Sequence, residues 1–396
     1  MRILLLAPFA LAACQSAPIP FDAPQAAVAF TGTAIIASDA RGIADPASAR
    51  PLQASDNVRI ASISKLAVAI GAMQLVEQGT LDLDRPVGDW LGYEVRHPAA
   101  EQGVTLRQLL SHTSGIRDGA SYALPLGARL EDTLGEADAW GAETPGYFSY
   151  ANLNFGIAAS AMEAATGERF DRLMERLLLR PLDIDACFNW PGCSDEAVAS
   201  AVVLTREGAP VWDDLKGQRP ACPVVVEEGE ACDLDRWRAG ENGSLFSPQG
   251  GLRISALDLA RIGQMLANGG SMAGVRILTP ASIEEMARPA WRWDGSNGDT
   301  WGGVFCAHGL GLHLLQTDRD GCKDDPGLPA GRWVGHSGDA YGLRSGLWID
   351  LQRSKGIAYH AGGLPEGPEN EISWEEGFFP IEQEMTARAL ALFGDR

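Results

Sequence analysis

The chain has 396 residues, of which 45% are hydrophobic and 21% charged, and its formal net charge at pH 7 is −20. This composition is typical of a globular protein with one large domain or two coupled domains. The negative charge argues against nucleic acid or an anionic lipid surface as a partner, because both require clustered lysine and arginine.

The N-terminal residues have the pattern of a secretion signal. Arg2 supplies a positive charge, the apolar run 3–13 is too short to cross a bilayer as a mature helix, and small residues precede Cys14. The sequence Leu-Ala-Ala-Cys resembles the bacterial lipoprotein box, in which cleavage leaves the cysteine lipidated. We expect residues 1–13 to be a signal peptide, Cys14 to be lipidated and residues 14–25 to form a linker. An ordinary signal peptide that contains a cysteine is the alternative.

The residue after the lipidated cysteine indicates whether a lipoprotein stays in the inner membrane. Gln15 stands where retention in the inner membrane usually shows Asp. Several acyl chains on one residue anchor a protein stably. We therefore expect a location in the bacterial cell envelope, on the periplasmic face of the outer membrane, with the lipid anchor as the only membrane contact.

Two early stretches have clear periodicity. Residues 26–38 alternate and are rich in β-formers, which predicts one strand that turns near residues 39–42 into a second. Residues 58–79 carry apolar residues three and four positions apart and end at a glycine, which predicts a helix. Ser62 lies in its first turn, and Lys65 would point from the same face.

An amine beside a hydroxyl is the arrangement that a nucleophilic serine requires. A lysine desolvated against an apolar helix face loses proton affinity, so Lys65 could act as the base that activates Ser62. The helix start also offers free backbone N–H groups for an oxyanion. Ser-x-x-Lys alone is a weak pattern, however, and a solvated helix face is the alternative interpretation.

Helices dominate the middle of the chain and strands the last third. Cap and stop residues predict helices that begin after Thr105, run from 152 or 153 to 166, from 168 to 179 and from 255 to 268, and close the chain at 382–393. Short β-rich runs predict strands at 310–315, 332–336, 344–350 and 356–361.

This order predicts an α/β (α+β) fold with an antiparallel sheet built from both ends of the chain. We expect an α/β domain made of residues 26–60 and 245–396, and an inserted, mostly helical domain of residues 61–244. Within the latter, residues 185–242 are irregular and form a loop-rich insertion stapled by disulfides.

Seven cysteines minus Cys14 leave an even number, which suits an oxidising compartment. Fifteen connectivities are possible, and proximity in the sequence favours three local bridges. The predicted pairs are Cys187 with Cys193, Cys222 with Cys232, and Cys306 with Cys322. The cysteine spacings do not match zinc ligation, and we expect no metal and no cofactor.

Two short motifs could complete a site around Ser62. Tyr150-Ala151-Asn152, at a turn into a helix, would supply a phenol for proton transfer and an amide for a substrate carbonyl. His336-Ser337-Gly338, at a strand end, would supply a hydroxyl, an imidazole and room for the substrate backbone. Taken singly, Tyr150 could be a core aromatic and His336 a structural imidazole.

Together these motifs resemble the serine β-lactamase and penicillin-binding protein superfamily, in the branch of class C β-lactamases, DD-carboxypeptidases and related esterases. That superfamily has Ser-x-x-Lys, then Tyr-x-Asn or Ser-x-Asn, then Lys-Thr-Gly or a variant. The resemblance covers almost the whole mature chain except the insertion. It also includes Leu109 to Gly115, Pro145-Gly146, Gly250 to Leu252 and Gly335 to Gly338.

The resemblance implies a role for each matching residue. Ser62 would attack a carbonyl to form an acyl-enzyme, with Lys65 as base and Tyr150 as the proton relay to the leaving group. Asn152, His336, Ser337, Gly338 and Asp339 would bind substrate, and the backbone N–H groups of Ser62 and Asp339 would form the oxyanion hole.

The third motif departs from the family. His336 replaces the lysine usual in class C β-lactamases and should be mostly neutral near pH 7, so it would hold a carboxylate less strongly. Asp339 should raise the pKa of this histidine. We expect His112 to be structural, and His97, His308, His313 and His360 show no metal-ligand spacing.

We therefore expect a serine hydrolase acting on a small-molecule or peptide substrate, foremost a D-amino-acid peptide as in DD-carboxypeptidases. An esterase of small acyl esters and a class C-like β-lactamase are the alternatives within the family. A catalytically silent lipoprotein that binds cell-wall peptide is the alternative of a different class. Fold and nucleophile are shared across specificities, so they do not identify the substrate.

Overall fold

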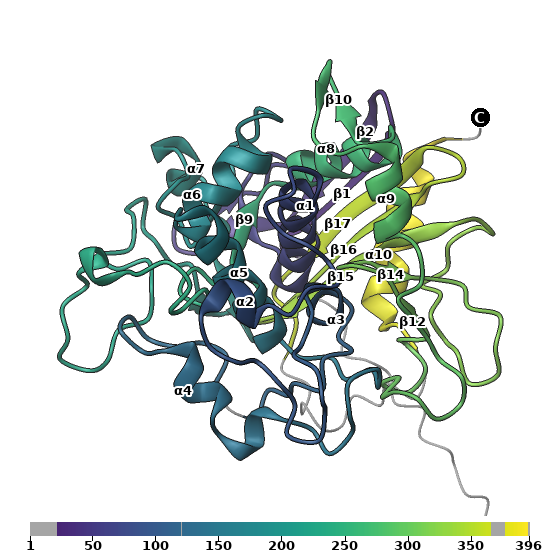
Figure 1. Ribbon diagram of the computed structural model, residues 1–396. Helices are drawn as coiled ribbons and strands as arrows, with labels where there is room; N and C mark the ends of the chain where they lie inside the picture. The colour runs from purple at the N-terminus through teal and green to yellow at the C-terminus, as the bar shows by residue number, and fades with distance from the viewer. Residues whose placement is uncertain (1–21, 120, 366–376, 395–396) are drawn as a thin grey trace, which may run out of the picture.

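The computed structural model describes residues 22–119, 121–365 and 377–394 (Figure 1). The expected signal peptide 1–13, Cys14 and most of the expected linker lie outside these residues. Over the described ranges, no helix combines the length and the apolar character that crossing a bilayer requires.

The centre of the molecule is a large antiparallel sheet that joins the two ends of the chain. Its strand order is β12-β13-β14-β15-β16-β17-β1-β2. The strands are β1 (Gln25–Thr31), β2 (Ile35–Arg41), β12 (Trp291–Arg292), β13 (Ala307–His308), β14 (His313–Leu314), β15 (Trp333–Ala340), β16 (Leu343–Asp350) and β17 (Lys355–Ala361). Strand β1 pairs with β17 over its whole length, so the expected mixed fold with an antiparallel sheet is confirmed.

Helices cover both faces of this sheet (Figure 1). Val28 and Phe30 point to the face covered by α8 (Ala256–Ala267), whereas Ala27 points to the opposite face, covered by α10 (Pro380–Ala391). A Cβ atom at Gly263 would collide with the Phe30 ring, so this glycine lets α8 approach the sheet closely.

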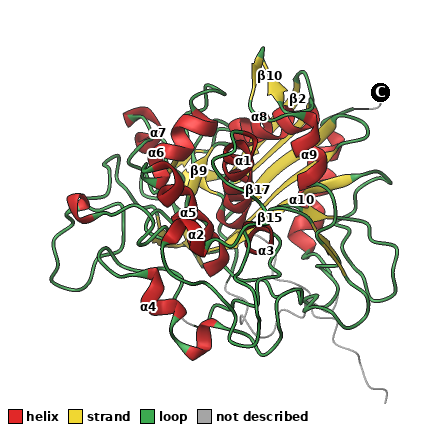
Figure 2. Ribbon diagram, in the orientation of Figure 1, coloured by secondary structure: helices red, strands yellow, loops and turns green. Residues whose placement is uncertain are grey.

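The remaining helices lie mainly on the other side of α1 from α10 and are joined by long loops (Figure 2). Helices α1 and α5 are apolar nearly all round and lie deep in the core, where nearly every one of their residues is buried. The helices are α1 (Ser64–Glu77), α2 (Gly88–Leu91), α3 (Leu106–Leu110), α4 (Leu130–Leu134), α5 (Leu153–Thr166), α6 (Phe170–Met174), α7 (Asp195–Ala199) and α9 (Pro280–Met286), with 3-10 turns η1 (Ala61–Ile63), η2 (Ala137–Ala139) and η4 (Leu234–Arg236) and a π-helical turn η3 (Glu175–Leu179).

Short strands tie the loops together. The largest such sheet joins β5, just before the Ser62 turn, to β9 and β6. The short strands are β3 (Ile43–Asp45), β4 (Arg50–Pro51), β5 (Val58–Arg59), β6 (Cys187–Phe188), β7 (Leu204–Arg206), β8 (Ala209–Trp212), β9 (Leu252–Ile254), β10 (Ser271–Met272) and β11 (Val275–Arg276).

Local capping signals are confirmed in the structure. Thr105 and Ser255 accept hydrogen bonds from the first turns of α3 and α8, and Gly167 ends α5 in the left-handed conformation. The prediction of a single strand over residues 26–38 is wrong, because Thr31 N donates to Ala34 O and turns the chain there. Gly32 lies in this turn and is a turn signal, but the β-formers on both sides of it favour one continuous strand.

The insertion 185–242 carries three short strands, one helix and one 3-10 turn between long loops. The structure contains disulfides Cys187–Cys193, Cys222–Cys232 and Cys306–Cys322, which are the pairs predicted from proximity. The first two lie within the insertion, and the third closes a loop between β12 and β15.

Candidate active site

Ser62 lies in the tight turn η1, between strand β5 and helix α1. Ala61, just before it, has φ of +50°, a conformation that costs a non-glycine residue energy and marks a tightly constrained turn. The Ser64 hydroxyl holds this turn, since it donates to Ala61 O at 2.7 Å and accepts from Leu252 N at 3.0 Å. Ser62 is thus presented at the N-terminal end of α1, slightly ahead of the regular helix.

Lys65 is fully buried in the first turn of α1 and donates to three oxygen atoms. Its Nζ lies 3.0 Å from Ser62 Oγ, 2.8 Å from Asn152 Oδ1 and 2.8 Å from the Gln249 carbonyl. Burial lowers the pKa of Lys65 to about 7, while the charge of Asp118 opposes the shift. The amine is therefore able to take up the Ser62 proton near neutral pH.

Asn152 is oriented by an acidic residue from a distant loop. Asp118 accepts hydrogen bonds from Asn152 N at 2.8 Å and from Asn152 Nδ2 at 2.9 Å. It also accepts from Leu153 N at 2.9 Å, so its carboxylate caps the N-terminus of α5. Asp118 thereby holds the Asn152 side chain in the orientation in which Oδ1 accepts the hydrogen bond from Lys65 Nζ.

Tyr150 occupies an aromatic slot beside Ser62 and Lys65. Its ring stacks on His112 at 4.2 Å and on Phe305 at 5.3 Å, between ring centroids. Burial raises the pKa of its phenol, and a hydrogen bond with Ser62 opposes the shift, so the phenol is neutral over the physiological range. A neutral phenol can donate a proton to a leaving group.

His112 packs against the Tyr150 ring and bonds the backbone next to it, in agreement with the structural role expected for this histidine. It is buried, and its Nδ1 accepts from Ala151 N at 3.1 Å. Burial, followed by the charges of His308 and Lys65, lowers its pKa, so the ring is neutral. It positions Tyr150 without adding charge.

His336 borders the site but provides no cation. Its Nδ1 lies 2.5 Å from Ser337 O, and because a carbonyl only accepts, Nδ1 carries the proton. Burial, followed by the charge of Lys65, lowers its pKa well below the ordinary value. The expectation that Asp339 raises this pKa is wrong: residues three apart on a strand point to opposite faces, and Asp339 pairs with Arg344 at 3.0 Å.

Strand β15 packs directly against the Ser62 turn. A Cβ atom at Gly338 would lie 3.2 Å from Ser62 N and would collide with Ile60 O and Ser345 Oγ. Ser345 Oγ donates to Ile60 O at 2.9 Å and joins the sheet to the turn. Only a glycine at this position lets the backbone beyond it come close to Ser62 N, as an oxyanion site on Ser62 N and Asp339 N would need.

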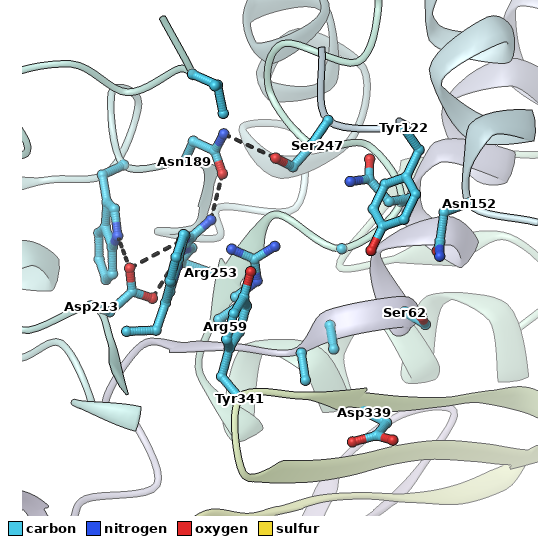
Figure 3. A pocket seen from close by; sticks show the side chains of 18 of the residues that line it. Arg59, Ser62, Tyr122, Asn152, Asn189, Asp213, Ser247, Arg253, Asp339 and Tyr341 are labelled. Atoms are coloured by element: carbon cyan, nitrogen blue, oxygen red, sulfur yellow. Dashed lines mark hydrogen bonds and ion pairs between the residues drawn. The ribbon is translucent and has the colours of Figure 1, made fainter. Parts of the chain in front are cut away.

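A cavity of about 1270 Å³ opens onto this group of residues (Figure 3). It is bordered by Ser62, Tyr150, Asn152, His336, Ser337 and Asp339 from the site, and by residues 212–215 and 218–225 of the insertion. Trp301 and Phe305 form an aromatic wall. In the described parts of the chain, no group of three or more His, Cys, Asp or Glu side chains could hold a metal ion.

The structure thus brings together Ser62, Lys65, Tyr150 and Asn152, which the sequence motifs predicted as a group. Sequence reasoning missed Asp118, Ser64 and the Gln249 carbonyl. Asp118 lies just beyond the Leu109 to Gly115 stretch and 34 residues before Asn152, so no local pattern in the sequence connects the two.

Comparison with known proteins agrees with this geometry. The family model for Beta-lactamase matches residues 20–377. The chain is 29% identical to penicillin-binding protein 4 of Amycolatopsis lactamdurans over 306 residues, covering 73% of this chain and 67% of the relative. It is 31% identical to esterase EstB of Burkholderia gladioli over 170 residues, covering 37% of this chain and 42% of that protein, so the match spans less than half of the esterase.

A solved structure of another protein shares the fold. The crystal structure of D-amino acid amidase from Ochrobactrum anthropi SV3 superposes with a TM-score of 0.65 at 19% identity, covering 93% of this chain and 92% of that one. Identity this low shows a shared fold alone. The family model, in contrast, covers most of the sequence, and the chain therefore belongs to the Beta-lactamase family.

Proposed function

We propose that the protein is a serine hydrolase that cleaves a D-amino-acid peptide or amide through an acyl-serine on Ser62. The observation that carries this proposal is the 3.0 Å contact between Lys65 Nζ and Ser62 Oγ, combined with a lysine pKa of about 7. A binding protein has no need of an activated hydroxyl, and a buried lysine beside it is costly to retain.

In the proposed first step, neutral Lys65 takes the proton of Ser62 as Oγ bonds to the carbonyl carbon. The carbonyl oxygen becomes an oxyanion that accepts from Ser62 N and Asp339 N. Tyr150 then donates its proton to the leaving nitrogen or oxygen as that bond breaks, and the Lys65 ammonium reprotonates Tyr150. Water attacks the acyl-serine by the same proton path in reverse and releases the acid.

Two observations support an amide of this kind as substrate. One relative, covered over 67% of its length, is named as a penicillin-binding protein, and the fold is shared with a D-amino acid amidase. Hydrolysis of small acyl esters is the second candidate. A neutral His336 in the third motif and the partial match to esterase EstB favour it.

One experiment tests the nucleophile and separates these candidates. The purified protein, Ser62→Ala and the exposed control Arg292→Gln are treated with a fluorescent fluorophosphonate and a fluorescent penicillin. Turnover of p-nitrophenyl butyrate, nitrocefin and a D-Ala-D-Ala peptide is then measured on the same preparations. We expect labelling of the protein and of Arg292→Gln but not of Ser62→Ala, with the peptide turned over fastest.

The other possible outcomes would assign a different function. If neither probe labels the protein, the enzymatic proposal is contradicted, and the alternative of a peptide-binding protein without catalytic activity is favoured. Fastest turnover of p-nitrophenyl butyrate would make the protein an esterase, and fastest turnover of nitrocefin a β-lactamase.

We further propose that Cys14 is lipidated and holds the enzyme at the periplasmic face of the outer membrane. The signal-like residues 1–13 and the three disulfides of the folded chain support a compartment outside the cytosol. Expression with an alkyne fatty acid should label the protein but not Cys14→Ser. Equal labelling of both, or recovery of the labelled protein in the inner-membrane fraction, would contradict this proposal.

A further inference from the structure

Arg59 borders the same cavity as Ser62, on the side of the insertion (Figure 3). It lies on the short strand β5, three residues before the nucleophile, and the turn at Ala61 presents both side chains to the same space. The position of this guanidinium is therefore tied to that of Ser62 by the backbone of a single tight turn.

The Arg59 side chain is buried, and no carboxylate among the described residues forms an ion pair with it. The residue is 7% exposed, and its buried Nε makes no hydrogen bond. Within the described ranges, no carboxylate or carbonyl accepts a hydrogen bond from its guanidinium. Burial, followed by the charge of Arg253, lowers the pKa of Arg59 to about 10, so it remains a cation at neutral pH.

The neighbouring arginine, Arg253, contrasts with Arg59 because its guanidinium has several hydrogen-bond acceptors. Arg253, paired opposite Arg59 in the β5–β9 ladder, donates to both oxygens of Asp213 at 3.2 and 3.0 Å. It also donates to Asn189 Oδ1 at 2.6 Å and Gly251 O at 2.8 Å. Asp213 is thereby engaged by Arg253, and although its charge raises the pKa of Arg59, it accepts no hydrogen bond from Arg59. Among the described residues, this single carboxylate faces the two guanidinium groups and is ion-paired with only one of them.

Two aromatic rings hold Arg59 in place. Its guanidinium carbon lies 5.2 Å from the Trp212 ring centroid and 5.0 Å from that of Tyr341, and these two rings stack on each other at 4.5 Å. Trp212 belongs to the insertion and Tyr341 to the β15–β16 turn. These cation–π contacts offset part of the desolvation cost and leave the guanidinium edge available.

We propose that Arg59 is an anion-binding residue of the substrate site and that it holds a carboxylate carried by the substrate. This inference rests on the proposed hydrolase function and adds the substrate's charge to it. A guanidinium fork matches a carboxylate in shape and in charge, and a buried site strengthens the pair. An ordinary buried cation without a partner would be expensive to keep.

The charge of the rest of the molecule favours such a role. The chain has a net charge of −20, which repels an anionic substrate, and His336 is neutral where the family pattern has a lysine. Arg59 thus supplies, from beside the nucleophile, the positive charge that the third motif lacks.

The test compares matched esters that differ by one carboxylate. One pair places it on the acyl group, p-nitrophenyl hemiglutarate against p-nitrophenyl valerate, and the other on the leaving group, 3-carboxyphenyl butyrate against phenyl butyrate. The ratio of kcat/KM for the charged ester to that for the neutral one is measured for the protein, Arg59→Met, Arg59→Lys and the exposed control Arg292→Gln. Taking the ratio cancels general effects on acylation.

We expect the ratio to fall by about tenfold or more in Arg59→Met for one of the two pairs, which identifies the side of the substrate that carries the charge. The ratio should fall less in Arg59→Lys than in Arg59→Met, and it should not fall in Arg292→Gln. Arg59→Met should melt at the same or a higher temperature, because it removes an unpaired buried charge. Ratios within about twofold of the unmodified protein for both pairs would overturn the proposal, and a lowered melting temperature with unchanged ratios would make Arg59 structural.

Binding separates this result from failure of the proposed chemistry. Calorimetry on Ser62→Ala measures the affinity for each ester without turnover, and the same titration is repeated on Ser62→Ala combined with Arg59→Met. A loss confined to the charged esters supports the anion site even if no ester is hydrolysed, and equal affinities in the two backgrounds overturn it.

Discussion

The Asp118 carboxylate holds both the backbone N–H and the side-chain amide of Asn152, at 2.8 and 2.9 Å. Through this pair, an exposed loop positions the start of α5 and directs the Asn152 oxygen onto Lys65 Nζ. The same carboxylate raises the proton affinity of Lys65 and so acts against its burial. Asp118 is a positioning residue that also tunes the base.

Replacing the charge at this position should shift the pH dependence. Asp118→Asn keeps an acceptor of similar shape but removes the negative charge that favours the Lys65 ammonium. We expect the acid limb of the acylation rate to move to lower pH, with a loss of stability of about 1 kcal/mol from the weakened cap. The measurement is fluorophosphonate labelling rate against pH, with urea unfolding alongside. An acid limb that stays in place would show that Asp118 acts through structure alone.

The unmodified enzyme should lose activity below neutral pH. Because Ser62 is activated only by the neutral amine and the pKa of Lys65 is about 7, acylation should be half-maximal near pH 7. Below that pH it should fall about tenfold per unit, as expected for one essential proton. Stopped-flow acylation by an ester probe between pH 5 and 9 provides the profile. A flat rate from pH 5 to 8 would exclude Lys65 as the base.

The same burial has a consequence for stability. The unfolded chain binds the Lys65 proton up to its ordinary pKa of 10.5, whereas the folded chain releases it near 7. Between these values the unfolded state binds more protons, so the contribution of this group to the free energy of unfolding rises with pH.

Tyr150→Phe should separate proton transfer from packing. The phenyl ring keeps the stacking on His112 and Phe305 and loses only the hydroxyl beside Ser62. We expect kcat for an amide substrate to fall by about 10²–10³-fold, with a small change in melting temperature. A substrate with a very good leaving group should be affected less, since it needs no protonation. Equal losses on both substrates would contradict the relay.

Glu163 should make the protein less stable as pH rises. It is 1% exposed in α5, and burial raises its pKa to about 8 against hydrogen bonds from Phe170 N, Trp237 Nε1 and Gly240 N. The folded state therefore holds a proton between about 4.5 and 8 that the unfolded state has lost, and this contribution to stability declines over that window.

Glu163→Gln should remove this decline. Oε1 accepts the two shorter bonds, at 2.9 and 3.1 Å, and Oε2 accepts only Gly240 N at 3.4 Å, so a glutamine oxygen at the Oε1 position preserves the better pair. Urea unfolding should find the variant more stable than the unmodified protein at pH 8 and similar to it at pH 4.5. A variant that is less stable at pH 8 would mean that Glu163 is ionised when folded.

Local features of the molecule could be predicted because they depend on neighbouring residues. The spacing of Ser62 and Lys65 brings them together on one turn. Thr105, Ser255 and Gly167 mark the ends of helices. Cysteines that are close in the sequence form disulfides with each other. Predictions failed where the surrounding pattern outweighed a single turn residue, as at Gly32 after Thr31, or where a strand's two faces mattered, as for Asp339 and His336.

The sequence by itself determined that Ser62 and Lys65 share one turn, that the stretch of α1 is helical, and that Gly167 ends α5, because each depends on contacts within a few residues. Only the tertiary structure decided that Asp118 reaches Asn152, that Gly338 touches the Ser62 turn, and that Arg59 borders the cavity with no ion pair to a described residue. Those relationships join segments far apart in the chain, and burial, which sets the charge of each group, exists only after they have packed together.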